Sequence, residues 1–258
     1  MDTALRWLAR GEDALPAGSD WLSAGEGAAA ASMRFTKRRQ EFLLRRLVAK
    51  HAVAVSIGRD TDALTLADIE VRNRPSGAPY IVINGTPSHL GVSISDRAGW
   101  AVCLVGPDVD GLGCDLELVE PRTDAFVRDF LTDAEQRYVF ACPAGEARHA
   151  AANLIWSAKE SALKVLGTGL RRDTRSVEVT LAAAPGAAGS AGDGWAELSV
   201  RAVEGTVFPG WWRRDGRFLF TVAARAGRSR PPTGLEPSNA LASAEPRHSW
   251  LASPMWTA

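Results

Sequence analysis

Apolar positions recur at helical spacing in three stretches of this chain. The first covers residues 34–58, where large apolar side chains fall three or four positions apart before a glycine. Two more, at 124–142 and 146–167, follow a proline and repeat the 3.6-residue spacing. Because this period places apolar side chains on one face of a helix, we predict a helix for each stretch.

Other parts of the chain show the alternation or short apolar runs that are typical of strands. These runs cover residues 69–73, 80–83, 90–96, 99–106, 111–119, 176–184, 195–203, 210–216 and 217–225. A turn is expected at 75–77 (Pro-Ser-Gly), and the small residues at 183–194 predict a flexible loop. Residues 1–25 show little periodicity, which predicts an irregular opening.

The predicted elements fall into two similar-sized halves. A helix followed by strands precedes about residue 106, and helices followed by strands come after it, which predicts an α+β fold. We expect an N-terminal lobe over 1–106 and a C-terminal lobe over 107–226. Residues 227–258 are rich in Pro, Ser and Ala, which predicts a mostly disordered tail.

The composition favours a globular protein: of 258 residues, 46% are hydrophobic and 23% charged. Basic and acidic residues balance at 30 each, which argues against a partner that is nucleic acid or a membrane surface. No apolar run approaches the ~18 residues of a membrane span, and the N-terminal stretch lacks a signal-peptide core. Three cysteines without metal-site spacing suit a reducing cytoplasm. We expect a cytoplasmic monomer.

Candidate chemistry begins with Asp115 and Glu117, which lie two positions apart in the apolar run 111–119. Strand alternation puts both carboxylates on one face, where their charges repel unless a cation lies between them. Oxygen ligands of this kind suit Mg²⁺, and Mn²⁺ is also possible. The alternative is an exposed edge strand whose polar face happens to be acidic.

A second candidate group lies in the predicted helix at 156–164, where Lys159, Glu160 and Lys164 follow Trp156. Glu160 and Lys164 form a favourable i,i+4 pair, so a surface salt bridge is the simplest interpretation. Glu160 could instead complete a metal site, with both lysines facing phosphate oxygens. The chain has only four lysines, and these two share one segment.

The third group is the basic stretch at 34–50, which holds the other two lysines, Lys37 and Lys50. It could be the solvated face of an amphipathic helix. It could also be a local anion site in an otherwise neutral protein, with Arg46 and Lys50 one turn apart.

Together these segments resemble the 4′-phosphopantetheinyl transferases of the larger, two-lobed Sfp type. The family's GxDxE strand is matched by GCDLE at 113–117, and its WxxKExxxK helix by the residues from Trp156 to Lys164. An upstream Gly-x-Pro element is matched by Gly77 and Pro79. The resemblance runs from about residue 34 to 225.

The resemblance implies a pseudodimer of two similar lobes, each with a small antiparallel sheet packed against helices. Coenzyme A would bind in the cleft as co-substrate. The enzyme would move its 4′-phosphopantetheine arm onto a serine of an apo acyl or peptidyl carrier protein, releasing 3′,5′-ADP. The larger class favours carrier proteins of secondary metabolite biosynthesis.

Site residues follow from the resemblance in the same way. Mg²⁺ would be held by Asp115, Glu117 and Glu160. Glu160, or a metal-bound water, would take the proton from the carrier serine, and Lys164 would stabilise the departing 3′,5′-ADP. Coenzyme A would be bound by Arg34, Lys37, Arg46, Lys50, Gly77, Pro79, Ser95, Asp96 and Lys159.

One position departs from the family pattern, since Asp96 stands where the family has a histidine and Arg97 follows it. A carboxylate there would repel the 3′-phosphate by ~1–4 kcal/mol. A catalytically impaired relative with altered coenzyme A binding is therefore an alternative. A non-enzymatic module that binds anions or nucleic acid through the Arg-rich helix is a second one.

Overall fold

The computed structural model spans residues 1–258 and describes all of them except 1–3, 108–110, 183–193, 226–229, 237–239 and 248–258. Apart from Gly194, the predicted flexible loop at 183–194 lies outside the described residues. Among the described residues, no helix combines the length and apolar character needed to cross a membrane.

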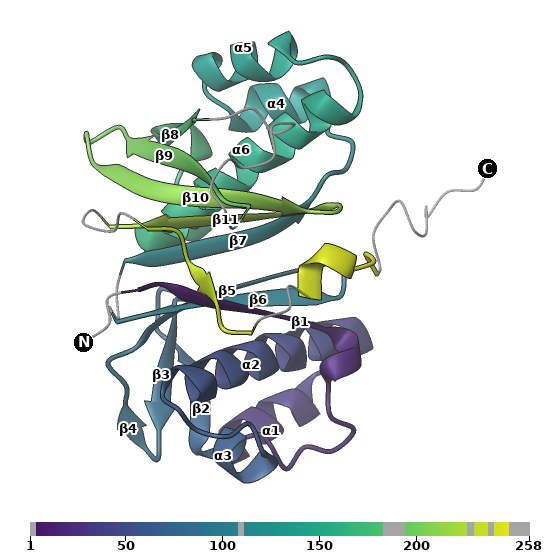
Figure 1. The fold of residues 1–258 in the computed structure, drawn as a ribbon, viewed down its shortest axis with the longest axis vertical. Coiled ribbons are helices and arrows are strands. Elements are labelled where there is room, and N and C mark those ends of the chain that lie inside the picture. The colour runs from purple at the N-terminus through teal and green to yellow at the C-terminus, as the bar shows by residue number, and fades with distance from the viewer. Residues whose placement is uncertain (1–3, 108–110, 183–193, 226–229, 237–239, 248–258) are drawn as a thin grey trace, which may run out of the picture.

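The described residues form two lobes that stack sheet against sheet, as Figure 1 shows. The lower lobe contains β1 (Arg6–Gly11), α1 (Ala24–Ser32), α2 (Thr36–Ser56), α3 (Ala63–Asp68), β2 (Ile69–Asn73), β3 (Pro79–Ile83), β4 (Thr86–Pro87), β5 (Gly91–Arg97) and β6 (Trp100–Gly106). The upper lobe contains β7 (Leu112–Leu118), α4 (Asp124–Phe130), α5 (Asp133–Ala141), α6 (Glu146–Val165), β8 (Val177–Leu181), β9 (Ala196–Ala202), β10 (Val207–Asp215) and β11 (Phe218–Ala224).

One long helix covers the outer face of each main sheet. The lower sheet has the order β12-β1-β6-β5, where β12 is Thr233–Gly234, and packs against α2. The upper sheet has the order β7-β11-β10-β9-β8 and packs against α6. A smaller sheet, β2-β3-β4, lies beside the lower one. The α+β fold of two lobes, each with an antiparallel sheet on helices, is therefore confirmed; the lobe boundaries at 106 and 226 stay predictions.

The two sheets meet in an apolar layer of their own. Its buried members come from both lobes and include Trp7, Leu104, Cys114, Trp195, Trp211 and Phe220. The rings of Trp7 and Phe220 lie 5.2 Å apart between centroids. Because side chains alternate along β1, Leu8 faces α2 while Trp7 enters this layer, so the strand buries apolar side chains on both sides. That double burial hides the period-two signal, and the predicted irregular opening is wrong for Arg6–Gly11.

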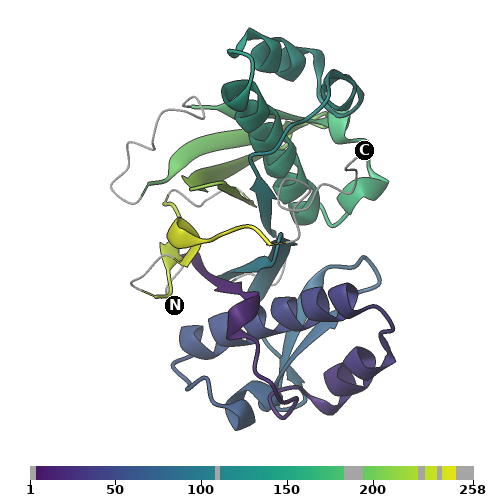
Figure 2. The same ribbon diagram turned by 90° about the vertical axis from the view of Figure 1, so that its right-hand side faces the viewer.

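Part of the predicted tail also belongs to the fold. Residues Thr233–Gly234 form β12, which pairs in parallel with β1, and Leu241 is fully buried in the layer between the sheets. In both views this yellow segment lies where the lobes meet (Figures 1 and 2). The prediction of disorder is wrong for these residues because composition does not show which apolar surface a short segment covers.

A buried ion pair occurs at corresponding places in the two lobes. In the lower lobe, Glu26 closes the capping box of α1, pairs with Lys50 Nζ at 2.5 Å and accepts a hydrogen bond from the backbone N–H of Val71. This links α1, α2 and β2 at one point.

The upper lobe repeats the arrangement with other residues. Glu135 closes the capping box of α5, pairs with Lys159 Nζ at 2.7 Å and accepts from the backbone N–H of Val179. The same three-way link, helix to long helix to strand, supports the description of the fold as a pseudodimer.

Candidate functional site

The candidate site forms where β5 of the lower lobe lies against β7 of the upper lobe. Ser95 Oγ donates a hydrogen bond of 2.9 Å to Asp115 Oδ1, and two residues further along both strands Arg97 Nε lies 3.2 Å from Glu117 Oε2. Strand alternation brings Ser95 and Arg97 to one face of β5 and the two acids to the facing side of β7. The acids that the motif places on one face therefore meet the opposite lobe.

A glycine lets helix α6 approach this strand. A Cβ atom built on Gly113 would lie only 1.8 Å from the backbone carbonyl oxygen of Ser161, so any side chain would push α6 away from β7. The glycine of the GxDxE pattern is thus required by close packing. It allows Glu160 and Lys164, on either side of Ser161, to lie over Asp115.

Asp115 is 6% exposed and is held by three side chains. Ser95 and Ser157 donate hydroxyl hydrogen bonds of 2.9 Å to its two oxygens, and Lys164 Nζ lies 2.9 Å from Oδ1. Lys164 Nζ also donates to the carbonyl oxygen of Cys114 at 2.8 Å. The carboxylate is therefore fixed in orientation by residues from β5 and α6.

Two arginines bind the neighbouring acids, Glu117 and Glu120. Arg122 Nη2 lies 3.4 Å from Glu117 Oε2 and 3.7 Å from Glu120 Oε1, and Arg97 contacts both carboxylates as well. Arg122 is anchored from behind, since its Nε donates to Asn153 Oδ1 at 2.6 Å. The sequence did not predict these contacts, because Arg97 comes from the lower lobe and its carboxylate partners from the upper one.

Two carboxyl groups around Asp115 are hard to ionise. Burial, together with the charge of Asp115, raises the pKa of Glu160 to about 7, although Lys164 acts in the opposite direction. Burial and the same charge raise the pKa of Glu117 to about 7, opposed by Arg97 and Arg122. Among the described residues, Glu160 accepts no hydrogen bond and makes no ion pair. Both shifts therefore come first from burial and second from the neighbouring charge of Asp115.

The donor set fits a hard divalent cation in kind: three carboxylates, one of them free of partners within the described residues. The three are not drawn into a closed cage, however. Among the described residues no three His, Cys, Asp or Glu side chains are grouped so that they could hold a metal ion, and Glu117 is already paired with arginines. The Mg²⁺ ligands Asp115, Glu117 and Glu160 therefore stay a prediction.

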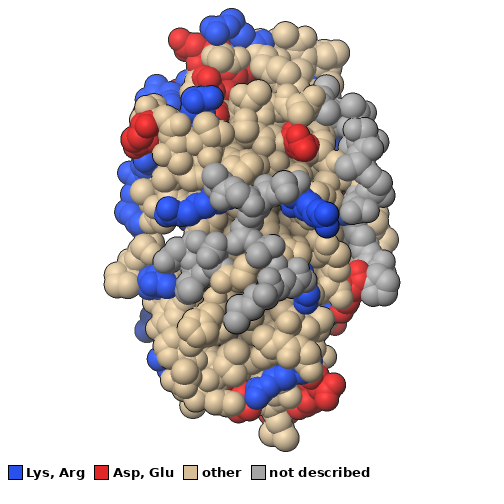
Figure 3. All heavy atoms as spheres, turned by 60° about the vertical axis from the view of Figure 1, so that its left-hand side comes forward, with Lys and Arg blue, Asp and Glu red and all other residues tan. Residues whose placement is uncertain are grey.

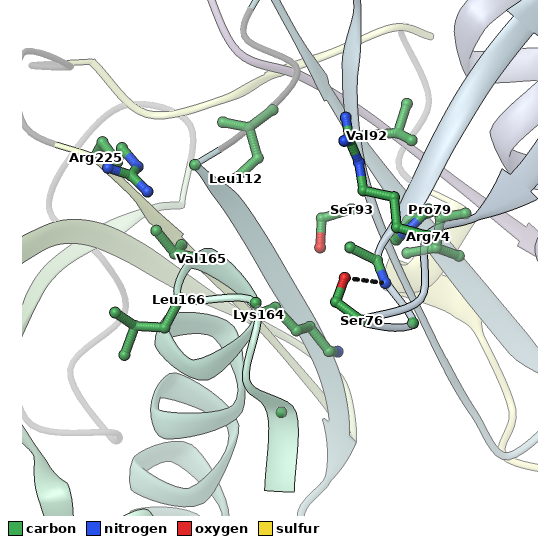
Figure 4. Close-up of a pocket in the computed structure, with 16 residues that line it drawn as sticks. Arg74, Ser76, Pro79, Val92, Ser93, Leu112, Lys164, Val165, Leu166 and Arg225 are labelled. Atoms are coloured by element: carbon green, nitrogen blue, oxygen red, sulfur yellow. Dashed lines mark hydrogen bonds between the residues drawn. The ribbon is translucent and has the colours of Figure 1, made fainter. Parts of the chain in front are cut away.

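A pocket of about 410 Å³ opens beside this cluster, between the lobes. Figure 4 shows its two walls: the turn with Ser76 and Pro79 from the lower lobe, and the end of α6 with Lys164 from the upper one. Its lining combines the apolar side chains of Val92, Leu112, Val165 and Leu166 with the cations Arg74, Lys164 and Arg225. Figure 3 shows Lys and Arg side chains on both sides of the level where the lobes meet.

Several predicted coenzyme residues lie at or beside this pocket. Gly77 and Pro79 line it, and Gly77 has the left-handed backbone, φ 91°, that the turn needs. Arg46 stacks on Phe42 at 3.8 Å and donates to Asn73 Oδ1 at 3.3 Å, and the Asn73 amide in turn donates to the Gly77 carbonyl. Arg46 therefore braces the turn.

Other predicted residues lie elsewhere. Lys50 and Lys159 are fully buried in the two ion pairs described above, so their prediction as coenzyme ligands is wrong: neither ammonium group reaches the cleft. Arg34 is exposed, and Lys37 is exposed and lies 4.0 Å from Glu41; neither lines the pocket.

Asp96 faces away from Asp115, as strand alternation requires. Its carboxylate accepts a 2.8 Å hydrogen bond from Arg45 Nη1 of α2, which offsets its charge. Arg97 points to the acids and not to the pocket. The pocket's Arg74 and Arg225 were missed because nothing in the sequence marks two isolated arginines as neighbours.

The geometry is accompanied by a family match. Residues 111–213, from the start of β7 into β10, match the family model described as the 4′-phosphopantetheinyl transferase superfamily. The matched part of the chain contains Asp115, Glu117, Glu160 and Lys164.

Two curated relatives and two solved structures are similar to the chain. It is 37% identical over 70 residues to a holo-[acyl-carrier-protein] synthase from Geobacillus sp. (strain WCH70), and 35% over 71 residues to one from Anoxybacillus flavithermus. Each match covers 27% of this chain, and the chain spans 59% of each relative.

The solved structures are a holo-(acyl-carrier-protein) synthase from Bacillus anthracis in complex with coenzyme A and one from Thermotoga maritima. The first is 24% identical, with a TM-score of 0.34, over 40% of this chain and 93% of that one. The second is 17% identical, with a TM-score of 0.32, over 51% and 76%. Membership of the two-lobed Sfp-type class stays a prediction.

Proposed function

We propose that this chain transfers the 4′-phosphopantetheine arm of coenzyme A to a serine of an apo acyl or peptidyl carrier protein, releasing 3′,5′-ADP. The observation that carries the proposal is the position of Lys164. Its ammonium group bonds to Asp115 in the acidic cluster and also lines the pocket between the lobes. Lys164 thus connects the carboxylates around Asp115 with the positively charged pocket.

The pocket suits a nucleotide that ends in phosphates. Its apolar side chains offer a surface for a base, and Arg74, Lys164 and Arg225 offer positive charge to phosphate oxygens. These residues replace Lys50 and Lys159 in the proposed coenzyme A site. Arg34, Lys37, Arg46, Ser95 and Asp96 remain proposals there, with Arg46 acting through the turn at Gly77.

Transfer requires a proton acceptor and a stabilised leaving group. The carrier serine oxygen attacks the phosphorus that bears the pantetheine arm, a new P–O bond forms, and the P–O bond to 3′,5′-ADP breaks. Glu160, which lies beside Asp115 and on the same helix face as Lys164, is the carboxylate proposed to take the serine proton; its pKa is about 7 in the cation-free protein. Lys164 is placed to neutralise charge on the departing phosphate.

A divalent cation fits the carboxylates Asp115, Glu117 and Glu160, which would hold it. When bound, Mg²⁺ would polarise the diphosphate of coenzyme A and neutralise its charge. Cytoplasmic location, a monomeric state and carrier proteins of secondary metabolism remain proposals.

Intact-mass analysis of an apo carrier protein tests this function. After incubation with the chain, coenzyme A and Mg²⁺, we expect a mass gain of one phosphopantetheine arm. Glu160→Gln should lose transfer by at least about 100-fold, whereas Glu41→Gln, at a half-buried side chain of α2 outside the pocket, should retain it. No mass gain with acyl or peptidyl carrier proteins, from a folded sample, would overturn the proposal.

A further inference from the structure

Arg97 forms an ion pair with Glu117, one of the carboxylates proposed to bind the cation. Its Nε lies 3.2 Å from Glu117 Oε2, and its Nη2 contacts Glu120 Oε1. The contact crosses from the lower lobe to the upper one, because Arg97 ends β5 while Glu117 lies on β7. A guanidinium is therefore bound where a metal ligand is expected.

The backbone fixes this position. Ser95 and Arg97 lie on the same face of β5, and Ser95 is tied to Asp115 by a 2.9 Å hydrogen bond, so Arg97 is carried to Glu117. Arg97 is only one-third exposed, at 33% of its side-chain surface. Arg97 does not line the pocket between the lobes.

Glu117 is shared between two cations on one atom. Both Arg97 Nε and Arg122 Nη2 contact Oε2. A divalent cation arriving at this carboxylate meets positive charge already in place, and like charges a few ångströms apart repel. Arg122 is held by Asn153, so Arg97 is the arginine that can yield.

Glu120 offers Arg97 a second resting place. Glu120 is 7% exposed, and its Oε2 has no hydrogen-bond partner among the described residues. If Arg97 lets go of Glu117, this free oxygen can accept a second N–H of the same guanidinium, giving a two-point contact. The buried Oε2 atom of Glu120 then gains a hydrogen-bond partner.

We propose that Arg97 is a built-in competitor for the divalent cation: it neutralises Glu117 in the cation-free protein and shifts fully onto Glu120 when the cation binds. It is a positioning residue, and the inference rests on the proposed cation site. The competition keeps the acidic cluster stable without metal and lowers its metal affinity.

Mn²⁺ binding, followed by electron paramagnetic resonance without coenzyme A, tests this proposal. We expect Arg97→Gln and Arg97→Ala to bind Mn²⁺ about tenfold more tightly than the wild type. The matched control is Arg45→Gln. Arg45 pairs with Asp96, which directly precedes Arg97 and lies on the other face of β5, so this variant should change the Mn²⁺ affinity less than about twofold. Unchanged or weaker binding in folded Arg97 variants overturns the proposal.

Glu120→Gln provides a second measurement. It should weaken Mn²⁺ binding more in the wild type than in Arg97→Gln, because only the wild type needs Glu120 as a resting place. Equal losses in the two backgrounds overturn the proposal.

Mn²⁺ binding by Glu160→Gln distinguishes a failure of the proposed cation site from a failure of the inference about Arg97. If wild type binds Mn²⁺ and Glu160→Gln weakens it, the cation site stands, and untightened binding by Arg97→Gln overturns only the inference. If neither wild type nor Arg97→Gln binds Mn²⁺, the proposed cation site is wrong, and the inference is overturned with it.

Discussion

Lys159 Nζ lies 2.7 Å from Glu135 Oε2, and both side chains are buried. The ammonium group also donates to the carbonyl oxygens of Thr174 and Val177. The three contacts satisfy all three of its N–H groups. The pair therefore holds α5, α6 and the approach to β8 together, and Lys159 acts as a structural residue.

Lys159→Met should lower the free energy of unfolding by about 3–5 kcal/mol, because it leaves the Glu135 charge buried without its partner. Urea denaturation measures the loss. Lys37→Met, at an exposed lysine, should change it by no more than about 0.5 kcal/mol. A folded, equally stable Lys159→Met with impaired coenzyme A binding would contradict the structural role.

The pH dependence of stability should carry a signature of Glu160. Its folded pKa, about 7, lies above the ordinary value of 4.5, so the folded state binds the proton more tightly than the unfolded state. The stability linked to this group is present below pH 4.5 and is lost as the pH rises through 7. The free energy of unfolding of the wild type and of Glu160→Gln can be measured by denaturation at pH 5 and pH 8 in the presence of a chelator. Between these pH values, the variant should become more stable relative to the wild type by up to about 3 kcal/mol. A constant difference between wild type and variant would argue against the shift.

Arg225→Ala should weaken coenzyme A binding about tenfold, because a charge-assisted contact to phosphate is removed from the pocket. Isothermal titration calorimetry with coenzyme A measures the change. Arg201→Ala, at an exposed arginine of β9 away from the pocket, is the matched control and should bind as the wild type does. Equal affinity in both variants would remove Arg225 from the site.

Asp96→His should strengthen coenzyme A binding several-fold, since it removes a carboxylate and frees Arg45 from its 2.8 Å hydrogen bond. The same titration measures it, with Asp60→Asn, an exposed acid after α2, as the control. Unchanged affinity would mean that Arg45 already cancels the effect of Asp96, and the impaired-relative hypothesis would lose its basis.

Leu241→Ala should destabilise the fold by about 2–5 kcal/mol, because this fully buried side chain fills the layer between the two sheets. Thermal unfolding checks it. Leu64→Ala, at a leucine that is 82% exposed, should leave the unfolding temperature almost unchanged. A similarly small effect of both changes would show that the C-terminal segment does not contribute to this core.

Local pattern was sufficient for much of the fold. The long helices α2 and α6 follow from apolar spacing alone. The strands from β2 to β11, apart from the two-residue β4, follow from alternation and turn residues, because these signals depend on near neighbours in the chain. Two strands, β1 and β12, were not predicted. β1 buries side chains on both faces, and β12 is only two residues long, so neither has a pattern that near neighbours in the chain reveal. The pattern of such segments depends on what covers them.

The sequence by itself determined the candidate residues for the proposed chemistry, since GCDLE and the helix from Trp156 to Lys164 mark Asp115, Glu117, Glu160 and Lys164 through their resemblance to the family motifs. Only the tertiary structure decided the roles of the other charges. Lys50 and Lys159 look like phosphate ligands in sequence, yet each is paired with a capping-box glutamate and buried. Whether a charge is solvated, paired or free depends on which distant residue lies within a few ångströms, and that distance exists only in the folded chain.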